Sequence, residues 1–546
     1  MKSYAGFLAY RIKMETSDFL VTEVSDLPLI ADPDSEGQSQ SSPTPGLQKN
    51  DSGSSGKASA DAPSEVPSHA ADRRGKGSRS AGKKGIGKKE SNSAKESVRK
   101  RGSGSGGAFS VYALEKDGWN TVDAIQKAAR QSGISTKEIH YGGKKDRHAR
   151  TIQWLTVKNG GDLSCEESGY SIRYLGRSSE PMGPEHILGN RFRLVIRNIL
   201  ERETSHVLAG ARRLQETGFP NYFDDQRFGS FHPLIGFPFL SLLRGDPESA
   251  LRFTLLSAFG GDKPHAKRRK KAINDNWGNW DECLKLASTK TESAILGQLK
   301  SNRCKAGDSS NASQKQFLEL LDRLPREDLS MGFSALQSWI FNESVARLFR
   351  NIEHLWKHSS SGSARSRGFR TVEIKTKTGD QTFPISVESR FLTLLDSMDF
   401  MLIGPGQKSP ARSNSESASE FDSASYSEDS CQKTIQSVLK ACRENQEATP
   451  DSDCKRLIQM AFLQCERQVT EVLEIPEQSF HQSFLKNAFL KSHSRPLWCI
   501  PQDMQWSDFS VDELNKGKLK YTVEFTLPRG VYATMAIKML HLRLKQ

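Results

Sequence analysis

The chain has 546 residues and carries 78 Lys and Arg against 65 Asp and Glu, a formal net charge of +13. This length allows roughly two to four domains, and the positive charge favours a polyanionic partner, either nucleic acid or an anionic membrane surface. No run approaches the ~18 apolar residues of a membrane-spanning helix, and the N-terminus lacks the pattern of a signal peptide, so a membrane protein is not expected.

Two segments interrupt the foldable sequence. Residues 31–106 are almost wholly Ser, Gly, Pro, Lys and Asp, and residues 406–430 form a Ser-rich, acidic stretch. Neither segment can bury enough apolar surface to offset its ordering entropy, so both are predicted to be disordered insertions. Within the first, GKKGIGKK at 82–89 resembles a phosphate-binding loop. It lacks the final Ser or Thr and the flanking strand and helix, and we therefore reject that interpretation.

The basic runs have several interpretations. Residues 73–101 hold twelve Lys and Arg against two Glu, and residues 267–271 read KRRKK. Such runs are typical of nuclear import signals and of RNA-contacting arms, and a solubilising linker is the plainer alternative. From them we expect a nuclear protein, with an additional cytoplasmic population as the alternative.

The first half of the chain predicts mixed secondary structure. Residues 109–115 read as a strand, and a helix should begin near Asn120 or Thr121, because both are acceptable N-caps. The spacing of Val122, Ile125 and Ala129 predicts that these three side chains face the core.

Two segments alternate between apolar and polar side chains. In residues 191–197, the apolar positions are expected to be buried, and Arg191, Arg193 and Arg197 are expected to share an exposed face. In residues 520–527, Tyr521, Val523, Phe525 and Leu527 fall on one side. Between these two strands, residues 334–350 predict a helix with Phe341, Val345, Leu348 and Phe349 on one stripe.

The most suggestive window for chemistry is YGGKKDRH at 141–148. Lys145 and Arg147 flank Asp146 and favour its ionised form, and a carboxylate can act as a nucleophile at an anomeric carbon. From composition alone, a solvated Asp paired with its neighbours is the commoner outcome. His148 has no evident partner nearby in the sequence, and we interpret it as structural.

A second window, 218–229, interleaves aromatic residues with Asn, Gln and Arg, a mixture that can stack on unpaired bases. A turn-rich connector with its aromatic side chains in the core is the alternative. Asp224 and Asp225 are adjacent and are expected to point apart, so a magnesium site is not predicted. The eight cysteines include no CxxC pair, which argues against a zinc ribbon or a disulfide framework and suits a reducing compartment.

The ordered motifs resemble the tRNA pseudouridine synthase D family, in particular its eukaryotic branch, the pseudouridylate synthase 7 homologues. Any one motif is weak, but their number and order make a specific signal. Gly142, Lys144, Arg150 and Met539 depart from the usual family residues, and the early start of the first motif predicts that an N-terminal extension is missing. In chain order the motifs are Lys13, DFLVTE at 18–23, Asn120-Thr121, YGGKKDRHARTIQ at 141–153, GNRF at 189–192, FPNYFDDQRFG at 219–229, QSWIFNE at 337–343, RPL at 495–497 and LPRGVYATMAIKM at 527–539.

The resemblance implies an α+β fold. It comprises a mixed-sheet pseudouridine synthase catalytic domain interrupted by a large α/β insertion domain that is specific to the family. Mapped onto this chain, the catalytic domain would comprise residues 1–30, 107–228 and 490–546, and the insertion domain residues 229–489.

The resemblance also implies the site. Asp146 would be the catalytic carboxylate, either attacking the ribose C1′ or removing a ribose proton. Isomerising uridine involves no redox change or group transfer, so no cofactor and no metal are expected. The substrate-binding positions would be Lys13, Phe19, Asn190, Phe192 and Tyr532. The candidates for RNA-backbone contacts are Lys144, Lys145, Arg147, Arg191, Arg193 and Arg227.

The sequence therefore predicts an RNA pseudouridine synthase that acts on tRNA, mRNA or another RNA, as a monomer and without a membrane partner. A non-catalytic RNA-binding or chaperone protein that retains the fold is the first alternative. A basic scaffold with no RNA function is the second.

Overall fold

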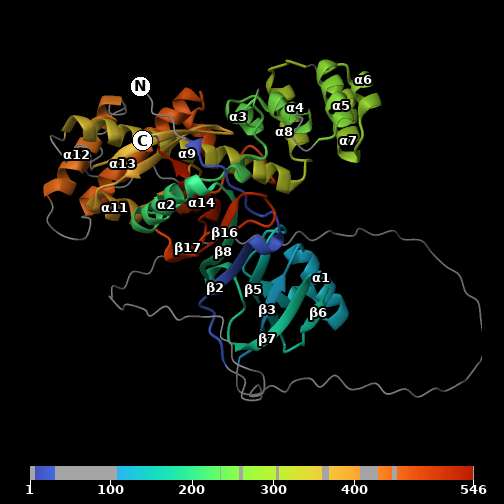
Figure 1. Ribbon diagram of the computed structural model, residues 1–546. Coiled ribbons are helices and arrows are strands. Elements are labelled where there is room, and N and C mark those ends of the chain that lie inside the picture. The colour runs from blue at the N-terminus through green and yellow to red at the C-terminus, as the bar shows by residue number, and fades with distance from the viewer. Residues whose placement is uncertain are drawn as a thin grey trace, which may run out of the picture.

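The computed structural model describes residues 6–30, 107–233, 235–256, 262–302, 306–359, 368–405, 428–444, 452–481 and 483–544 (Figure 1). The predicted insertion 31–106, with its basic run and its loop-like motif, lies outside the described residues, as does most of 406–430. The end of the second segment was placed too late, because α12 (Glu428–Glu444) already begins inside it.

A mixed sheet is built from both ends of the chain. Its strands follow the order β15-β17-β8-β2-β5-β3-β7-β6, with β16 added to β17 and β4 added to β5. β2 and β5 pair in parallel, and the other pairings of this sheet are antiparallel. The strands are β2 (Phe19–Ser25), β3 (Phe109–Lys116), β4 (Ile139–Tyr141), β5 (Arg150–Lys158), β6 (Cys165–Glu167), β7 (Tyr170–Ser178), β8 (Ile187–Ile199), β15 (Gln502–Trp506), β16 (Ser510–Val511) and β17 (Leu519–Pro528).

β8 and β17 carry the two predicted alternating segments and pair with each other. Leu194 lies opposite Val523, and Phe192 lies opposite Phe525, with all four side chains buried. The predicted exposed face is wrong at Arg197, which is buried. Its guanidinium pairs with the buried carboxylates of Asp18 and Asp512, which cover this end of the face.

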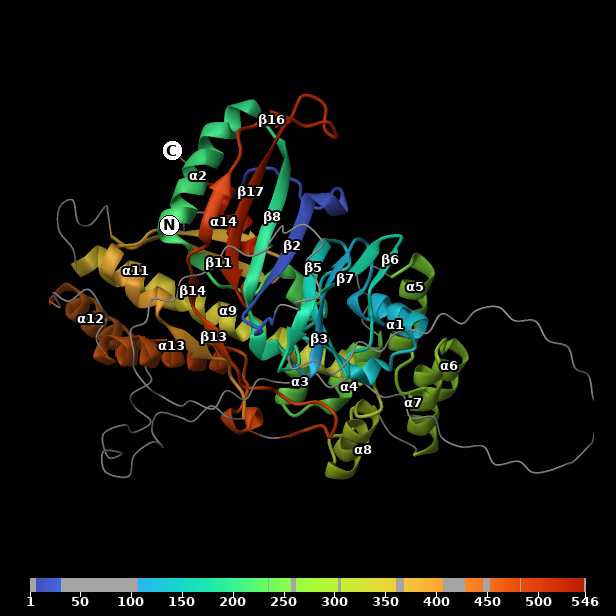
Figure 2. The same ribbon diagram turned by 90° about the horizontal axis from the view of Figure 1, so that it is seen from below.

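Three helices flank the sheet: α1 (Thr121–Ser132), α2 (Thr204–Thr217) and α14 (Ala533–Leu540). Figure 2 shows α2 and α14 beside β8 and β17, and α1 beside the other end of the sheet. The predicted start of α1 is confirmed, with Asn120 as N-cap. Ile125 and Ala129 are buried as expected, but Val122 is only partly buried, and Ala124 and Ala128 face the core instead.

Helices dominate the region between α2 and β15, together with a hairpin of β10 (Arg370–Thr376) and β11 (Gly379–Ser386). Figure 1 shows α4 to α8 on one side of the long helix α9, and α11 to α13 on its other side. The helices are α3 (Pro238–Leu243), α4 (Pro247–Leu256), α5 (Pro264–Asp275), α6 (Trp280–Leu286), α7 (Lys290–Ser301), α8 (Asn311–Leu321), α9 (Arg326–Ser359), α11 (Ser389–Asp396), α12 and α13 (Ser452–Val472).

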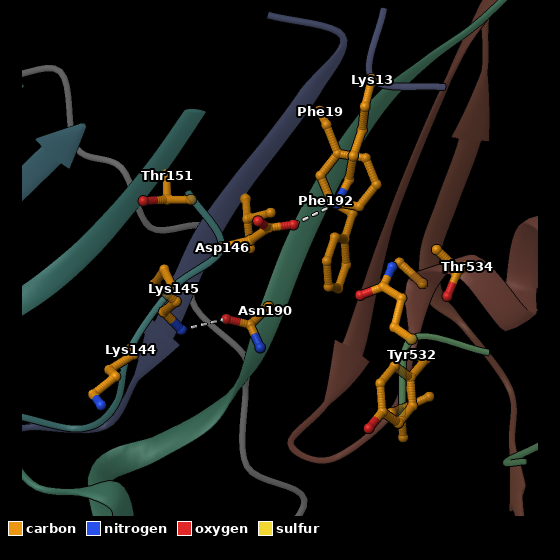
Figure 3. A pocket seen from close by; sticks show the side chains of 14 residues that line it. Lys13, Phe19, Lys144, Lys145, Asp146, Thr151, Asn190, Phe192, Tyr532 and Thr534 are labelled. Carbon is orange, nitrogen blue, oxygen red and sulfur yellow. Dashed lines mark hydrogen bonds and ion pairs between the residues drawn. The ribbon is translucent and has the colours of Figure 1, made fainter. Parts of the chain in front are cut away.

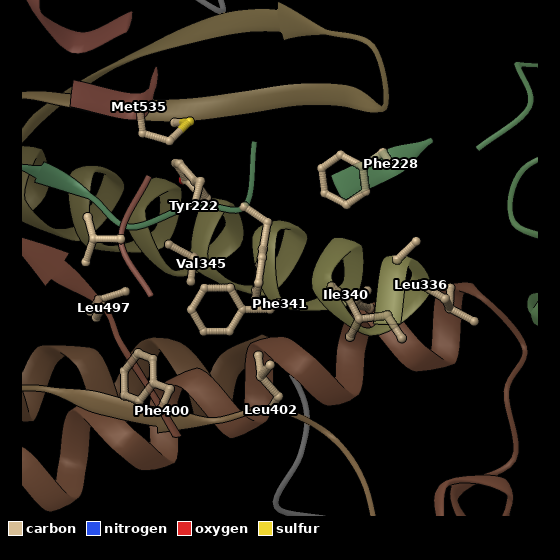
Figure 4. Close-up of a cluster of buried hydrophobic side chains, with 14 of the residues drawn as sticks. Tyr222, Phe228, Leu336, Ile340, Phe341, Val345, Phe400, Leu402, Leu497 and Met535 are labelled. Atoms are coloured by element: carbon tan, nitrogen blue, oxygen red, sulfur yellow. The ribbon is translucent and has the colours of Figure 1, made fainter. Parts of the chain in front are cut away.

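The predicted stripe of α9 forms the centre of the helical core. Phe341, Val345, Leu348 and Phe349 are all buried, as expected. Figure 4 shows Phe341 and Val345 facing Phe400, Leu402 and Tyr222, from segments far apart in the chain. One continuous apolar cluster joins this core to the buried faces of β8 and β17.

Short strand pairs connect the outlying segments. They are β1 (Gly6–Phe7) with β18 (Leu542–Arg543), β9 (Phe219–Pro220) with β14 (Trp498–Cys499), and β12 (Asp399–Met401) with β13 (Ser494–Pro496). Among the described residues, no helix is long and apolar enough to cross a membrane.

Candidate active site

Asp146 lies in the loop between β4 and β5, at the edge of a cavity of about 270 Å³ (Figure 3). All five predicted substrate-binding residues line this cavity. Six further lining residues were not named as site residues, although each of them lies in one of the family motifs. The lining residues are Lys13, Phe19, Val21, Lys144, Lys145, Asp146, Thr151, Asn190, Phe192, Gln226, Val531, Tyr532, Ala533 and Thr534.

Two donors hold the Asp146 carboxylate. Lys13 Nζ lies 2.5 Å from Oδ2, and the backbone N–H of His148 donates to Oδ1 at 3.0 Å. Burial by itself raises the pKa of Asp146, but the hydrogen bonds from Lys13 and from the His148 N–H outweigh it and hold the pKa below its usual value. The side chain keeps 41% of its surface exposed, so the ionised carboxylate faces the cavity.

Lys13 reaches the site from an unusual backbone conformation. Its φ is +57°, in the left-handed region that non-glycine residues rarely adopt, and such strain is often found at functional sites. Its Nζ lies 4.2 Å from the centroid of the Phe19 ring, a cation–π contact. The Phe19 ring in turn meets Phe192 edge-on at 6.2 Å, so aromatic surface flanks the ion pair.

Hydrogen bonds from two side chains to backbone carbonyl groups hold the loop that carries Asp146. Lys116, a buried residue at the end of β3, donates to the Asp146 carbonyl at 2.7 Å, and the Gln153 side chain donates to the Gly143 carbonyl at 3.1 Å. Desolvation lowers the pKa of Lys116 to about 8, although Asp146 and Asp117 favour its charged form. Sequence reasoning missed Lys116, because a lysine at a strand end is ordinarily a solvated residue.

Lys145 was predicted to contact the RNA backbone, but its side chain points into the sheet. Its Nζ lies 2.7 Å from Glu23 Oε2 and donates to Asn190 Oδ1 at 2.7 Å. Lys144 is exposed at the rim of the cavity, and exposed Arg147 donates to the Gly118 carbonyl.

The other predicted arginines lie outside the cavity lining. Arg191 and Arg193 are exposed on β8, and each makes a 3.1 Å ion pair with Glu524 of β17. Arg227 donates to the Ser338 hydroxyl of α9 at 3.2 Å. Among the cations predicted to contact RNA, only Lys144 and Lys145 therefore line the cavity.

Arg495 supports Tyr532, which lines the cavity. From the sequence, Arg495 was named only as part of a motif. Its guanidinium is buried 3.8 Å from the Phe223 ring centroid and 5.5 Å from that of Tyr532, and it hydrogen-bonds to Asn221 and to the Gly530 carbonyl. Desolvation lowers the pKa of Arg495 to about 10. These contacts fix Tyr532 at the start of α14.

Asp224 and Asp225 do not point apart as expected. Both carboxylates contact Lys538 Nζ, at 2.5 and 2.9 Å respectively. The part of the chain that the structure describes holds no group of three or more metal-ligating side chains.

The arrangement brings one ionised carboxylate into an open cavity between aromatic side chains and one amide. A flat aromatic ring can stack on such side chains, and the carboxylate is free to attack a carbon or to accept a proton.

Comparisons with known proteins point to one family. The sequence model of the family described as tRNA pseudouridine synthase D (TruD) matches residues 89–368. A tRNA pseudouridine synthase D of Leptospira interrogans is 32% identical over 440 residues, which are 80% of this chain and 90% of the relative. That of Aquifex aeolicus is 29% identical over 247 residues, 43% of this chain and 59% of the relative.

The fold is similar to a crystal structure from Methanosarcina mazei that carries the same family designation. The TM-score is 0.57 at 18% identity, and the match covers 99% of this chain and 95% of that chain.

Proposed function

The chain belongs to the tRNA pseudouridine synthase D family of RNA isomerases, and from this premise we propose that Asp146 is the catalytic carboxylate that converts uridine to pseudouridine. The observation that carries the proposal is the ionised Asp146, held by Lys13 in a cavity walled by aromatic rings. It is also the one carboxylate of the motif at 141–153, and its side chain lines the cavity.

The reaction breaks the N1–C1′ glycosidic bond, turns the uracil and joins C5 to C1′. N1 gains a proton and C5 loses one, so atoms and charge balance without an external oxidant or reductant. Asp146 acts either by attacking C1′ or by removing a ribose proton, and both routes need the ionised carboxylate that Lys13 favours.

The target base leaves its stack before it reaches the cavity, at a cost of a few kcal/mol. Phe19, Phe192 and Tyr532 line the cavity and offer aromatic surface that replaces the lost stacking. Lys144 at the rim offers a cation for the RNA backbone.

The test uses tRNA labelled with tritium at uridine C5, because that hydrogen is lost as a proton during isomerisation. Wild-type protein should release tritium, and Asp146→Asn should lower the rate by at least about 10³-fold while RNA affinity is retained. Tritium release by Asp146→Asn at the wild-type rate would overturn the assignment of Asp146.

The alternatives give other outcomes in the same assay. A non-catalytic RNA-binding protein would bind tRNA with a steep salt dependence and release no tritium even as wild type. A scaffold without an RNA function would show little salt-dependent binding at all.

The domain bounds, a further RNA substrate and the cellular location rest on the same proposal. We propose that residues 1–30, 107–228 and 490–546 form the catalytic domain, because strands from both chain ends pair in one sheet. That mRNA is a further substrate and that the protein acts in the nucleus are predictions. Mapping pseudouridine across cellular RNA with and without the protein, and locating the protein by microscopy, would test them.

A further inference from the structure

Lys145 stands next to Asp146 in the sequence, yet its side chain turns away from the exposed rim. The side chain is 12% exposed, and the Glu23 carboxylate that it pairs with is fully buried. Glu23 also accepts a hydrogen bond from the Trp154 N–H at 3.1 Å. A lysine that forms an ion pair with a buried carboxylate is a poor partner for an RNA phosphate. If its ammonium group moved to the phosphate, the buried carboxylate would be left unpaired.

We propose that Lys145 is a positioning residue, which together with Glu23 fixes the Asp146 loop and orients the Asn190 amide as a hydrogen-bond donor to a carbonyl oxygen of the target uracil. This inference rests on the proposed function and adds to it the chemistry by which the base is recognised.

The sheet brings the three residues together. Glu23 on β2 and Asn190 on β8 are register partners in adjacent antiparallel strands. Lys145 reaches both from the loop after β4, and its own backbone N–H donates to Thr121 Oγ1 at the start of α1, at 3.1 Å. Backbone and side chain of Lys145 are thus both anchored, one residue before Asp146.

The direction of the Asn190 amide follows from chemistry. An ammonium group can only donate hydrogen bonds, so the Asn190 atom 2.7 Å from Lys145 Nζ must be the amide oxygen. The NH2 group then points the other way, as Figure 3 shows. Within the described residues this NH2 group makes no hydrogen bond, and Asn190 lines the cavity.

A donor at this place suits uracil. Both exocyclic groups of uracil are carbonyl oxygens, which accept hydrogen bonds, whereas cytosine carries an amino donor at C4. If Lys145 were lost, the amide would be free to turn its oxygen to the cavity, and the base would meet an acceptor. The Lys145–Glu23 pair therefore serves recognition and loop position together.

The test compares Lys145→Met with two other lysine variants: Lys144→Met at the cavity rim, and Lys137→Met, an exposed lysine before β4. Single-turnover rates at saturating tRNA, RNA affinity and its salt dependence are measured for each. For Lys145→Met we expect the rate to fall about 10- to 100-fold, as for loss of a hydrogen bond to a charged group, with affinity and salt slope unchanged.

The two comparison variants give the opposite patterns. Lys144→Met should weaken binding and reduce the salt slope by about 0.7 to 0.9, the value of one lost phosphate contact. Lys137→Met should match the wild type in rate and affinity. If Lys145→Met behaves like Lys144→Met, with a reduced salt slope and a full rate at saturation, the inference is overturned.

Stability is controlled separately, because Lys145→Met leaves Glu23 buried without a partner. The double variant Glu23→Gln/Lys145→Met removes both charges and should melt near the wild-type temperature while it keeps the rate defect. A double variant that is folded and fully active contradicts the inference. Wild-type protein that releases no tritium contradicts the proposed function instead, so the two failures are distinguishable.

A separate variant tests whether the NH2 group of Asn190 donates a hydrogen bond to the base. Asn190→Asp has nearly the same shape and keeps a partner for Lys145, but it offers the cavity only acceptors. We expect its kcat/KM for uridine-containing tRNA to fall at least about tenfold. Unchanged kcat/KM would show that no donor at Asn190 is used.

Discussion

Two lysine–carboxylate sites of this protein have nearly the same local geometry but different surroundings. Lys13 lies 2.5 Å from Asp146, and Lys538 lies 2.5 Å from Asp224. Burial raises the pKa of each aspartate, but the lysine and the further hydrogen bonds to each carboxylate together outweigh it and lower the pKa. The Asp146 side chain is 41% exposed to a cavity, whereas that of Asp224 is 6% exposed.

The difference teaches that a lowered pKa does not by itself identify a catalytic carboxylate. Asp224 and Lys538 satisfy each other inside the fold and tie α14 to the segment after β9. Asp146 has the same kind of partner, but its carboxylate remains exposed to a cavity that aromatic side chains line. Access to a shaped cavity separates the two sites.

The largest expected effect on stability is at the buried site. Lys538→Met leaves Asp224 without its cation, and we expect the free energy of unfolding to fall by about 3 to 5 kcal/mol, as for other buried pairs that lose one partner. Chemical denaturation measures this. The exposed Lys516→Met is the matched control and should stay within about 0.5 kcal/mol of wild type.

Activity provides the second half of that test. Folded Lys538→Met at low temperature should retain pseudouridine formation, because neither partner touches the reacting atoms. If Lys538→Met were as stable as wild type yet inactive, the contrast between the two sites would be broken.

The next effect is at the cavity and depends on pH. Lys13→Met removes the cation that lowers the pKa of Asp146, while burial continues to raise it, so the pKa moves up. The proposed mechanism needs the ionised carboxylate, so the acidic limb of the plot of kcat against pH should move to higher pH. Near the optimum we expect kcat to fall about 10- to 100-fold.

Lys137→Met is the control for that profile, because its side chain is exposed and does not line the cavity. An acidic limb that stays at the same pH in Lys13→Met would mean that Lys13 does not set the charge of Asp146. Loss of folding is excluded by comparing the melting curves at each pH.

The smallest expected effect is on stability, and it distinguishes the two aspartates that contact Lys538. Asp225 also contacts Lys538, but its side chain is 41% exposed. Asp225→Asn should therefore cost less than about 1 kcal/mol, as at exposed ion pairs, and Asp224→Asn clearly more. Equal losses in the two variants, measured by denaturation, would contradict the distinction drawn from exposure.

Much of the local structure could be predicted. The alternating pattern of β17 and most of β8 followed from the two-residue period of a strand, and the stripe on α9 followed from the helical period. The window around Asp146 was singled out by its charges, and the order of motifs led to the family. These features depend on neighbours in the sequence, which the sequence displays directly.

Three side chains were misjudged for a common reason. Arg197 and Lys145 were expected to face solvent, and Asp225 was expected to point away from Asp224. Arg197 is instead paired with Asp18 and Asp512, and Lys145 with Glu23. In each case the partner lies more than a hundred residues away in the chain, where no periodic pattern could indicate it.

The sequence by itself determined several strands and helices, among them β8, β17 and the core stripe of α9, because these depend on local spacing and side-chain type. It also singled out Asp146 as the candidate carboxylate, through its charged neighbours and the order of the motifs. Only the tertiary structure decided which lysine pairs with Asp146 at the cavity and which pairs with a buried carboxylate of the sheet. That choice depends on what lies opposite each side chain, and for Lys145 it is a buried carboxylate on β2, brought there by the pairing of β2 with β8.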